Sequence, residues 1–134
     1  MKYILLMQFA QSTADFPAIT TWQPEEIQAH IGFMMDTNRK LAESGELVEA
    51  NGLAMPDTAR IVRAGAGGGP AVVTEGPFAE TKEFLAGWWI VDVEDEARAV
   101  ELAAQVSAAP GPGGAPLNMP IEVRQVMSAP TEDV

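Results

Sequence analysis

The sequence has no cysteine and only one histidine, His30, among its 134 residues. Without thiols there can be no disulfide, thiolate metal site or cysteine nucleophile. One imidazole cannot build a zinc site from several histidines. Carboxylates could still hold Mg²⁺ or Ca²⁺, but the chain has no Asp-rich metal-binding loop. We therefore expect neither a metal nor another cofactor.

Basic residues are scarce as well. Eight lysines and arginines are set against 19 acidic residues, which leaves a net charge of −11 at pH 7. Nucleic-acid binding depends on clustered Lys and Arg, and an anionic membrane surface attracts the same residues. The composition therefore argues against nucleic acid and against a membrane as partners.

The chain also lacks a long hydrophobic run, since no segment approaches the ~20 apolar residues of a membrane span. The opening segment MKYILLMQFAQSTA has a short apolar run, interrupted by Gln8, with a single lysine. We interpret it as a first strand rather than a secretion signal and expect a cytoplasmic protein. With 47% hydrophobic and 20% charged residues, the chain fits one globular domain over 1–134.

Strand and helix signals follow one another regularly along the chain. A helix is predicted from Pro24 to about Ser44, because proline and acidic residues suit its start and Gly45 its end. A second helix is predicted over 95–108, with Asp95 as its N-cap. The first helix has apolar positions at a period of 3.6, namely Ile27, Ile31, Met34, Met35, Leu41 and Ala42.

The remaining segments predict strands and loops. The order β-α-β-β-β-α-β indicates an α+β fold, a ferredoxin-like antiparallel sheet with two helices on one face. The predicted strands are 2–9, 47–53, 58–64, 84–93 and 121–127. The predicted loops are a hairpin loop at 65–70, a flexible Pro/Gly loop at 109–120 and a frayed tail at 128–134.

Strand 84–93 is apolar on both of its faces. Leu85, Trp89, Val91 and Val93 alternate with Phe84, Trp88 and Ile90. Two helices can cover only one face of the sheet, and a face left in water would be polar. A second copy of the same sheet is the simplest cover for the other face. We therefore predict a homodimer with the sheets packed face to face.

Two polar residues of the first predicted helix are candidates for a site. His30 lies at the edge of the apolar stripe, where an imidazole could act as acid or base in a cleft, or could simply be a half-buried surface residue. Asn38 lies near the centre of the stripe. A buried amide must be hydrogen-bonded, either to backbone of the next turn or within a pocket. Both interpretations stay open for each residue.

A second set of candidates lies around a sharp turn before the aromatic strand. Glu75, Glu80 and Lys82 crowd together there and are followed by Trp88. Carboxylates and an ammonium beside a flat aromatic wall could bind a small molecule or provide an acid or base. A solvated loop entering a core strand would have the same composition.

Four segments resemble one known family. TEGPFAETKE, residues 74–83, followed by LAGWW, residues 85–89, resembles the signature of the DGPF branch of the YCII-related family. Three other segments are similar to the family's first strand, its helix-to-strand junction and its last strand. These are MKYILLM (1–7), NRKLAESGELVEANGLAMP (38–56) and IEVRQV (121–126).

The resemblance covers about residues 1–127 and implies a dimeric α+β barrel with a ligand cleft in each protomer. It implies no settled activity, because most of the family has none assigned. Some DGPF proteins resemble partners encoded beside extracytoplasmic-function sigma factors. One branch of the wider family contains a dehydrochlorinase-like enzyme that uses a helix-one histidine with a carboxylate.

The chain departs from the family's pattern at two positions. Glu75 stands where the signature usually begins with Asp. The family's catalytic histidine lies closer to the glycine that ends helix one, near Met34 and about one turn beyond His30. Asn38, in contrast, matches the DGPF branch.

Three functions are compatible with these observations. The first is a small-molecule-binding protein that acts as an acid–base, lyase-like enzyme. His30 would then be acid or base, Glu75 or Glu80 its carboxylate partner, and Lys82 an anion holder, with Asn38 and Trp88 contacting the ligand. The second is a non-catalytic regulatory or sensing dimer, associated with an extracytoplasmic-function sigma factor. The third is a purely structural dimer.

Overall fold

The computed structural model describes residues 1–9, 19–75 and 84–128. Four strands form an antiparallel sheet in the order β2-β5-β1-β6, and two further strands form a separate hairpin. The strands are β1 Lys2–Phe9, β2 Leu47–Gly52, β3 Arg60–Arg63, β4 Val72–Glu75, β5 Phe84–Asp92 and β6 Ile121–Gln125. The helices are α1 Pro24–Glu43 and α2 Glu96–Ser107.

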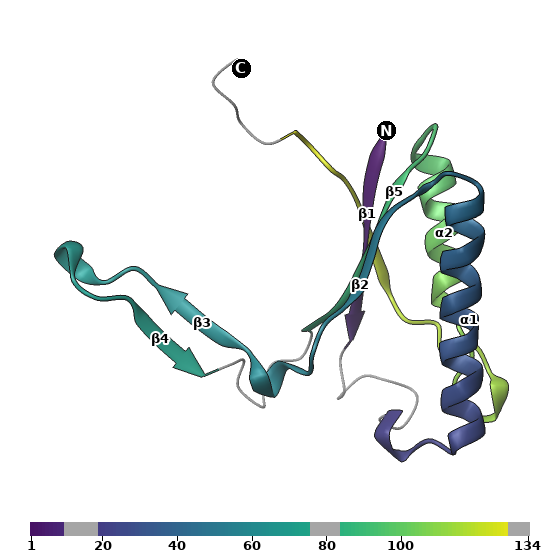
Figure 1. Ribbon diagram of the computed structural model, residues 1–134, viewed down its shortest axis with the longest axis horizontal. Helices are drawn as coiled ribbons and strands as arrows, with labels where there is room; N and C mark the ends of the chain where they lie inside the picture. The colour runs from purple at the N-terminus through teal and green to yellow at the C-terminus, as the bar shows by residue number, and fades with distance from the viewer. Residues whose placement is uncertain (10–18, 76–83, 129–134) are drawn as a thin grey trace.

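The four-stranded sheet confirms the ferredoxin-like arrangement. Its central strands β1 and β5 pair antiparallel, with Leu5 opposite Trp89 and Tyr3 opposite Val91. The outer strands β6 and β2 pair with β1 and β5 respectively. Both helices lie against the same face of this sheet (Figure 1).

The core lies between that face and the helices. Leu5, Val91 and Val106 are fully enclosed, and they bring together β1, β5 and α2. The buried strand residues occupy alternate positions, Tyr3 and Leu5 on β1 and Trp89 and Val91 on β5, because successive strand side chains point to opposite faces. The other buried members of this cluster are Tyr3, Leu41, Trp89, Val93, Ala99, Leu102 and Ala103.

Local sequence signals set the ends of both helices. At the start of α1, the Glu26 carboxylate accepts a hydrogen bond from the backbone N–H of Gln23 at 2.9 Å, in a capping box. After α1, Gly45 adopts a φ of +80°, a left-handed conformation that favours glycine. At the start of α2, the Asp95 carboxylate accepts from the backbone N–H of Arg98 at 3.0 Å. The predicted cap at Asp95 is therefore confirmed.

The face of α1 that packs inward differs from the predicted apolar stripe. Leu41 is buried as expected, but Ile31 and Met35 are 49% and 67% exposed. The packed face is turned toward His30, because Trp22 and the segment 109–120 cover that side of the helix. The prediction for Ile31 and Met35 was wrong, since it took every apolar residue as inward-facing.

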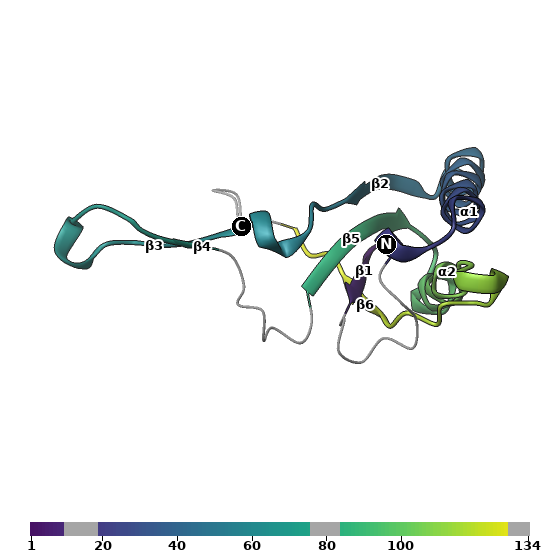
Figure 2. The ribbon, with the colours of Figure 1, turned by 90° about the horizontal axis from the view of Figure 1, so that it is seen from below.

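The hairpin corrects the sequence analysis in a second place. Segment 58–64 was predicted as a strand, and β3 within it pairs with β4, a strand that was not predicted. The two strands are joined by a short 3₁₀ turn at Ala66–Gly68, so the glycine-rich segment is a hairpin loop as expected. The hairpin reaches out from the sheet on the side away from the helices, as Figures 1 and 2 both show.

Within the described ranges, no helix is long and apolar enough to cross a membrane. The tail prediction for 128–134 falls mainly on residues outside those ranges.

Candidate functional site

A second, smaller core lies beside the first turns of α1. Trp22, Leu117 and Met119 are buried there, and Ile27 and Met34 of α1 pack against them. Leu117 and Met119 belong to the Pro/Gly segment 109–120, which is anchored to α2 by a hydrogen bond from the Ser107 hydroxyl to the Met119 carbonyl. This segment forms one wall around the histidine.

His30 is held in place by a backbone carbonyl and by an aromatic side chain. Its Nδ1 lies 3.0 Å from the carbonyl oxygen of Pro110, and its ring packs edge-on against Trp22 at 5.6 Å between centroids. A carbonyl oxygen can only accept, so Nδ1 carries the hydrogen and donates it. In the neutral imidazole the lone pair is therefore on Nε2. Nε2 has no hydrogen-bond partner among the residues that the structure describes.

Asn38 is bonded across the core to the sheet. The indole N–H of Trp89 donates to Asn38 Oδ1 at 2.8 Å. Because an indole nitrogen can only donate, this bond fixes which end of the amide is oxygen. The Asn38 NH₂ group is left without a partner in the described part of the chain. The Asn38 oxygen thus has a hydrogen-bond partner, whereas its two N–H donors have none among the described residues.

His30 and Asn38 line one cavity between α1 and the β2–β5 edge of the sheet, with a volume of about 230 Å³. A water molecule occupies about 30 Å³ in the liquid, so the cavity suits a small organic molecule. Its other lining residues are mostly apolar, namely Met7, Met34, Ala50, Asn51, Gly52, Trp88 and Trp89.

The cavity extends along α1. His30, Met34 and Asn38 are spaced at i, i+4 and i+8, so they share one face of the helix and span about 12 Å along its axis. The methionine therefore forms an apolar floor between two polar ends. At the sheet side, Gly87 allows β2 and β5 to approach closely, because a Cβ there would lie 2.7 Å from the Asn51 carbonyl oxygen.

The structure brings together only some of the residues that sequence analysis singled out. His30, Asn38 and Trp88 all border the 230 Å³ cavity. Glu75 is exposed at the end of β4 and is not among the residues that line it. Glu80 and Lys82 lie outside the described residues. The roles predicted for all six residues stay predictions.

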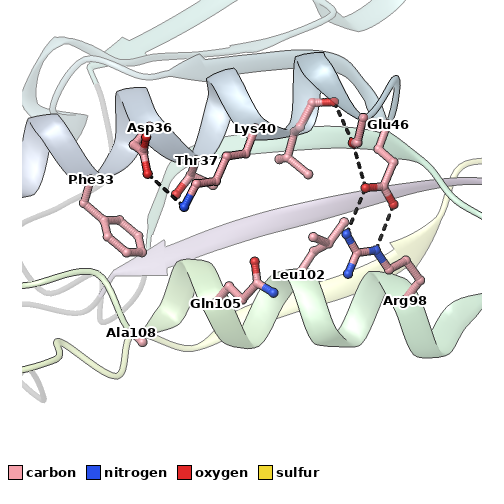
Figure 3. Close-up of a pocket in the computed structure, with 11 residues that line it drawn as sticks. Phe33, Asp36, Thr37, Lys40, Glu46, Arg98, Leu102, Gln105 and Ala108 are labelled. Carbon is pink, nitrogen blue, oxygen red and sulfur yellow. Dashed lines mark hydrogen bonds and ion pairs between the residues drawn. The ribbon is translucent and has the colours of Figure 1, made fainter.

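A larger groove of about 430 Å³ lies between the two helices on their outer side. Figure 3 shows its charged residues paired with one another: Lys40 with Asp36 at 3.1 Å, and Arg98 with Glu46 at 2.8 and 2.9 Å. The Arg98 guanidinium lowers the pKa of Glu46, and Glu46 in turn raises the pKa of Arg98. The charged groups that line the groove are therefore paired with one another, and its uncharged polar residues are Thr37, Ser44 and Gln105.

No group of three or more His, Cys, Asp or Glu residues that could hold a metal ion occurs in segments 1–9, 19–75 and 84–128. The smaller cavity is lined by the His30 imidazole and the Asn38 amide, each with a polar group that has no hydrogen-bond partner among the described residues. Sequence reasoning missed the Pro110 carbonyl and the contact of Trp22 with His30, since both depend on segments far from α1. The i, i+4, i+8 spacing of His30, Met34 and Asn38 was visible and could have indicated their shared face.

Comparison with known proteins places the chain in a family. A sequence model of the YCII-related domain matches residues 1–113. The chain belongs to the YCII-related family. It is also 32% identical over 95 residues to the uncharacterised protein R00369 of Rhizobium meliloti (strain 1021), across 71% of this chain and 75% of that protein. The fold and the cavity are therefore the features of this YCII-related protein from which a function can be argued.

Proposed function

We propose that this YCII-related protein, as a homodimer of the DGPF branch, binds a small organic molecule in the cavity between His30 and Asn38. The observation that carries the proposal is that two residues with polar groups unpartnered among the described residues, His30 with its Nε2 and Asn38 with its NH₂, line the same cavity. Binding sites are typically apolar with a few convergent polar groups of this kind.

The geometry also supports one class of ligand. The Asn38 NH₂ requires an acceptor, such as a carbonyl or carboxylate oxygen, at one end of the molecule. The apolar floor at Met34 and the walls at Trp89 and Met7 suit a hydrocarbon or aromatic middle. His30 Nε2 accepts a hydrogen bond, which suits a hydroxyl or an acidic C–H at the other end. An elongated hydroxy or keto acid with an apolar body meets these requirements.

His30 is arranged to transfer a proton. Its Nδ1–H is held by the Pro110 carbonyl, so the ring is oriented with Nε2 as the basic atom. That arrangement supports a lyase-like step in which Nε2 takes a proton from a C–H of the bound hydroxy acid, a C=C bond forms, and the hydroxyl on the neighbouring carbon leaves as water with that proton. Among the described residues, no carboxylate lines the cavity. This feature favours the second function, a dimer that senses the same ligand without turning it over.

The open face of the sheet supports the dimer. We use this name for the side away from the helices, where half-buried apolar residues on β1 and β5 are flanked by polar residues on β2 and β6. An apolar centre with a polar rim is the usual anatomy of a protein interface. The centre consists of Ile4, Leu6, Trp88 and Ile90, and the rim consists of Glu49, Asn51, Glu122 and Arg124.

A cytoplasmic location stays a prediction from the sequence.

Thermal melting with a panel of hydroxy and keto acids tests the ligand proposal. Asn38→Asp keeps an oxygen for the Trp89 indole but removes the NH₂, and His30→Asn keeps a donor near Nδ1 but removes Nε2. We expect a ligand that raises the melting temperature of the wild type to lose that effect in both variants. Gln105→Ala, in the interhelix groove, is the control and should respond as the wild type does.

Measuring turnover of the ligand distinguishes the enzyme from the sensing dimer. If the wild type consumes the ligand and His30→Asn does not, even at ligand concentrations that saturate the variant, the enzyme proposal stands. If wild-type protein binds the ligand without consuming it, the sensing function stands. A ligand response that survives in Asn38→Asp and His30→Asn but is lost in Gln105→Ala would show that the site is the interhelix groove and would overturn the proposal.

A further inference from the structure

The β3–β4 hairpin is the one part of the fold for which the described residues provide no support. Apart from pairing with each other, β3 and β4 make few contacts with any other described helix or strand. All eight residues of the two strands are exposed. An isolated two-stranded hairpin is marginally stable at best in water. Its regular register therefore implies a surface that supports it.

The hairpin has the composition of a contact surface. Val62 pairs directly with Val73, and these side chains are 61% and 58% exposed. On the opposite side, Ile61 and Val72 are 37% and 52% exposed. β-Branched residues on both sides of a ribbon favour packing and are poorly suited to solvent. Both faces of the hairpin are thus candidates for burial.

The position of the hairpin indicates what that surface is. It projects beyond the sheet on the side of the open face, away from α1 and α2 (Figures 1 and 2). Each strand is about 13 Å long at 3.3 Å per residue, and sheets that pack face to face lie about 10 Å apart. When a second copy covers the open face, the hairpin is long enough to cross into the layer occupied by that copy.

The charges of β3 also favour a second copy of the chain as the covering surface. β3 contains Arg60 and Arg63, two of only eight basic residues in a chain of net charge −11. Glu75 lies opposite Arg60 in the register, whereas Arg63 lies opposite Val72 and has no acidic partner among the described residues. A second copy of this acidic chain supplies the complementary surface.

We propose that the β3–β4 hairpin is a dimerisation arm, which lies on the second copy and is exchanged symmetrically between the two protomers. This inference rests on the proposed dimer and extends it. The dimer interface would include the hairpin as well as the open face, so each protomer would hold its partner at two places.

Sedimentation velocity over a dilution series of the full-length chain tests the arm. Val73→Glu places a charge in the hairpin. Val100→Glu, on α2, is a matched control with the same substitution at a side chain that is 51% exposed. We expect Val73→Glu to raise the dimer Kd by about tenfold or more, because a buried unpaired charge weakens association. Val100→Glu should leave the Kd within about twofold.

A third variant, Ile90→Glu, separates the arm from the sheet interface. If Ile90→Glu yields monomers while Val73→Glu behaves as Val100→Glu does, the arm proposal fails and the face-to-face dimer stands. If the wild type sediments as a monomer, both proposals fail. Amide exchange provides an independent readout, since a hairpin seated on a partner should exchange slowly in the wild-type dimer and rapidly in the Ile90→Glu monomer. Equal protection of residues 60–75 in both would overturn the arm.

Discussion

The two faces of the central sheet come from the same two strands but have different surroundings. Leu5 and Leu6 are neighbours on β1, yet Leu5 is fully enclosed under the helices, whereas Leu6 is only half-buried on the open face. Trp89 and Trp88 on β5 differ in the same way. Both faces are apolar at their centres, but only one is completed by the protomer's own helices. An apolar strand position therefore identifies a contact without saying which chain supplies the other half.

The largest loss of folding stability should come from truncating a side chain on the helix-covered face of the sheet. We expect Leu5→Ala to destabilise the fold by about 3 kcal/mol, because it removes a fully enclosed side chain and leaves a cavity. Chemical denaturation at fixed protein concentration measures this loss.

The matched variant Leu6→Ala sharpens the comparison. It should cost about 1 kcal/mol or less in dilute protein, with a cost that grows as the protein concentration rises into the dimer range. Equal, concentration-independent losses at Leu5 and Leu6 would mean that the two faces do not differ as described.

The next largest difference in unfolding free energy should be between substitutions of the two neighbouring tryptophans on β5. Trp89→Phe removes the N–H that Asn38 Oδ1 accepts, and the half-buried amide loses its one side-chain hydrogen-bond partner among the described residues. We expect a loss of about 2 kcal/mol in unfolding free energy. Trp88→Phe leaves that bond intact and should cost about 1 kcal/mol or less in dilute protein. Urea titrations followed by far-UV circular dichroism compare them, and a Trp88 effect as large as that of Trp89 would contradict the assignment of the two rings.

A smaller, pH-dependent effect should come from the ion pair that ties α2 to the start of β2. The pKa of Glu46 is lowered in the folded state, chiefly by its hydrogen bonds to Arg98. The pair therefore stabilises the fold above the unfolded pKa of a glutamate, about 4.3, and this contribution is lost as the pH falls through the folded value. Glu46→Gln should cost about 1–2 kcal/mol at pH 7.

Denaturation of Glu46→Gln and the wild type at several pH values checks the sign. The difference between the two proteins should shrink as the solution is acidified below about pH 4. Glu49→Gln, on the open-face rim, is the control and should differ little from the wild type at pH 7. A difference at Glu46 that stayed constant into acid would show that the ion pair is not its cause.

Local signals were sufficient to predict much of the fold. Gly45 and Asp95 marked helix ends because their effects act within a turn, and the two-sided pattern of 84–93 separated Trp88 from Trp89. The inward face of α1 was mispredicted because Trp22 and the segment 109–120, which cover it, are remote in sequence. β4 was missed because VVTE is too short to stand out beside its glycine-rich turn.

The candidate site was only partly accessible from sequence for a related reason. His30 was identified as the single histidine, at the edge of the predicted apolar stripe, and Asn38 as an amide near the centre of that stripe. Their partners, the Pro110 carbonyl and the Trp89 indole, lie 80 and 51 residues away along the chain. Pairings over such separations depend on the assembled sheet and cannot be read from spacing.

The most direct test of the account is the mass of the protein in solution, because the contrast between the two faces requires a partner for the open one. Size-exclusion chromatography with light scattering at micromolar concentration should give twice the mass of one chain for the wild type and the mass of one chain for Ile90→Glu. A wild-type protein that elutes as a monomer under these conditions would contradict the account.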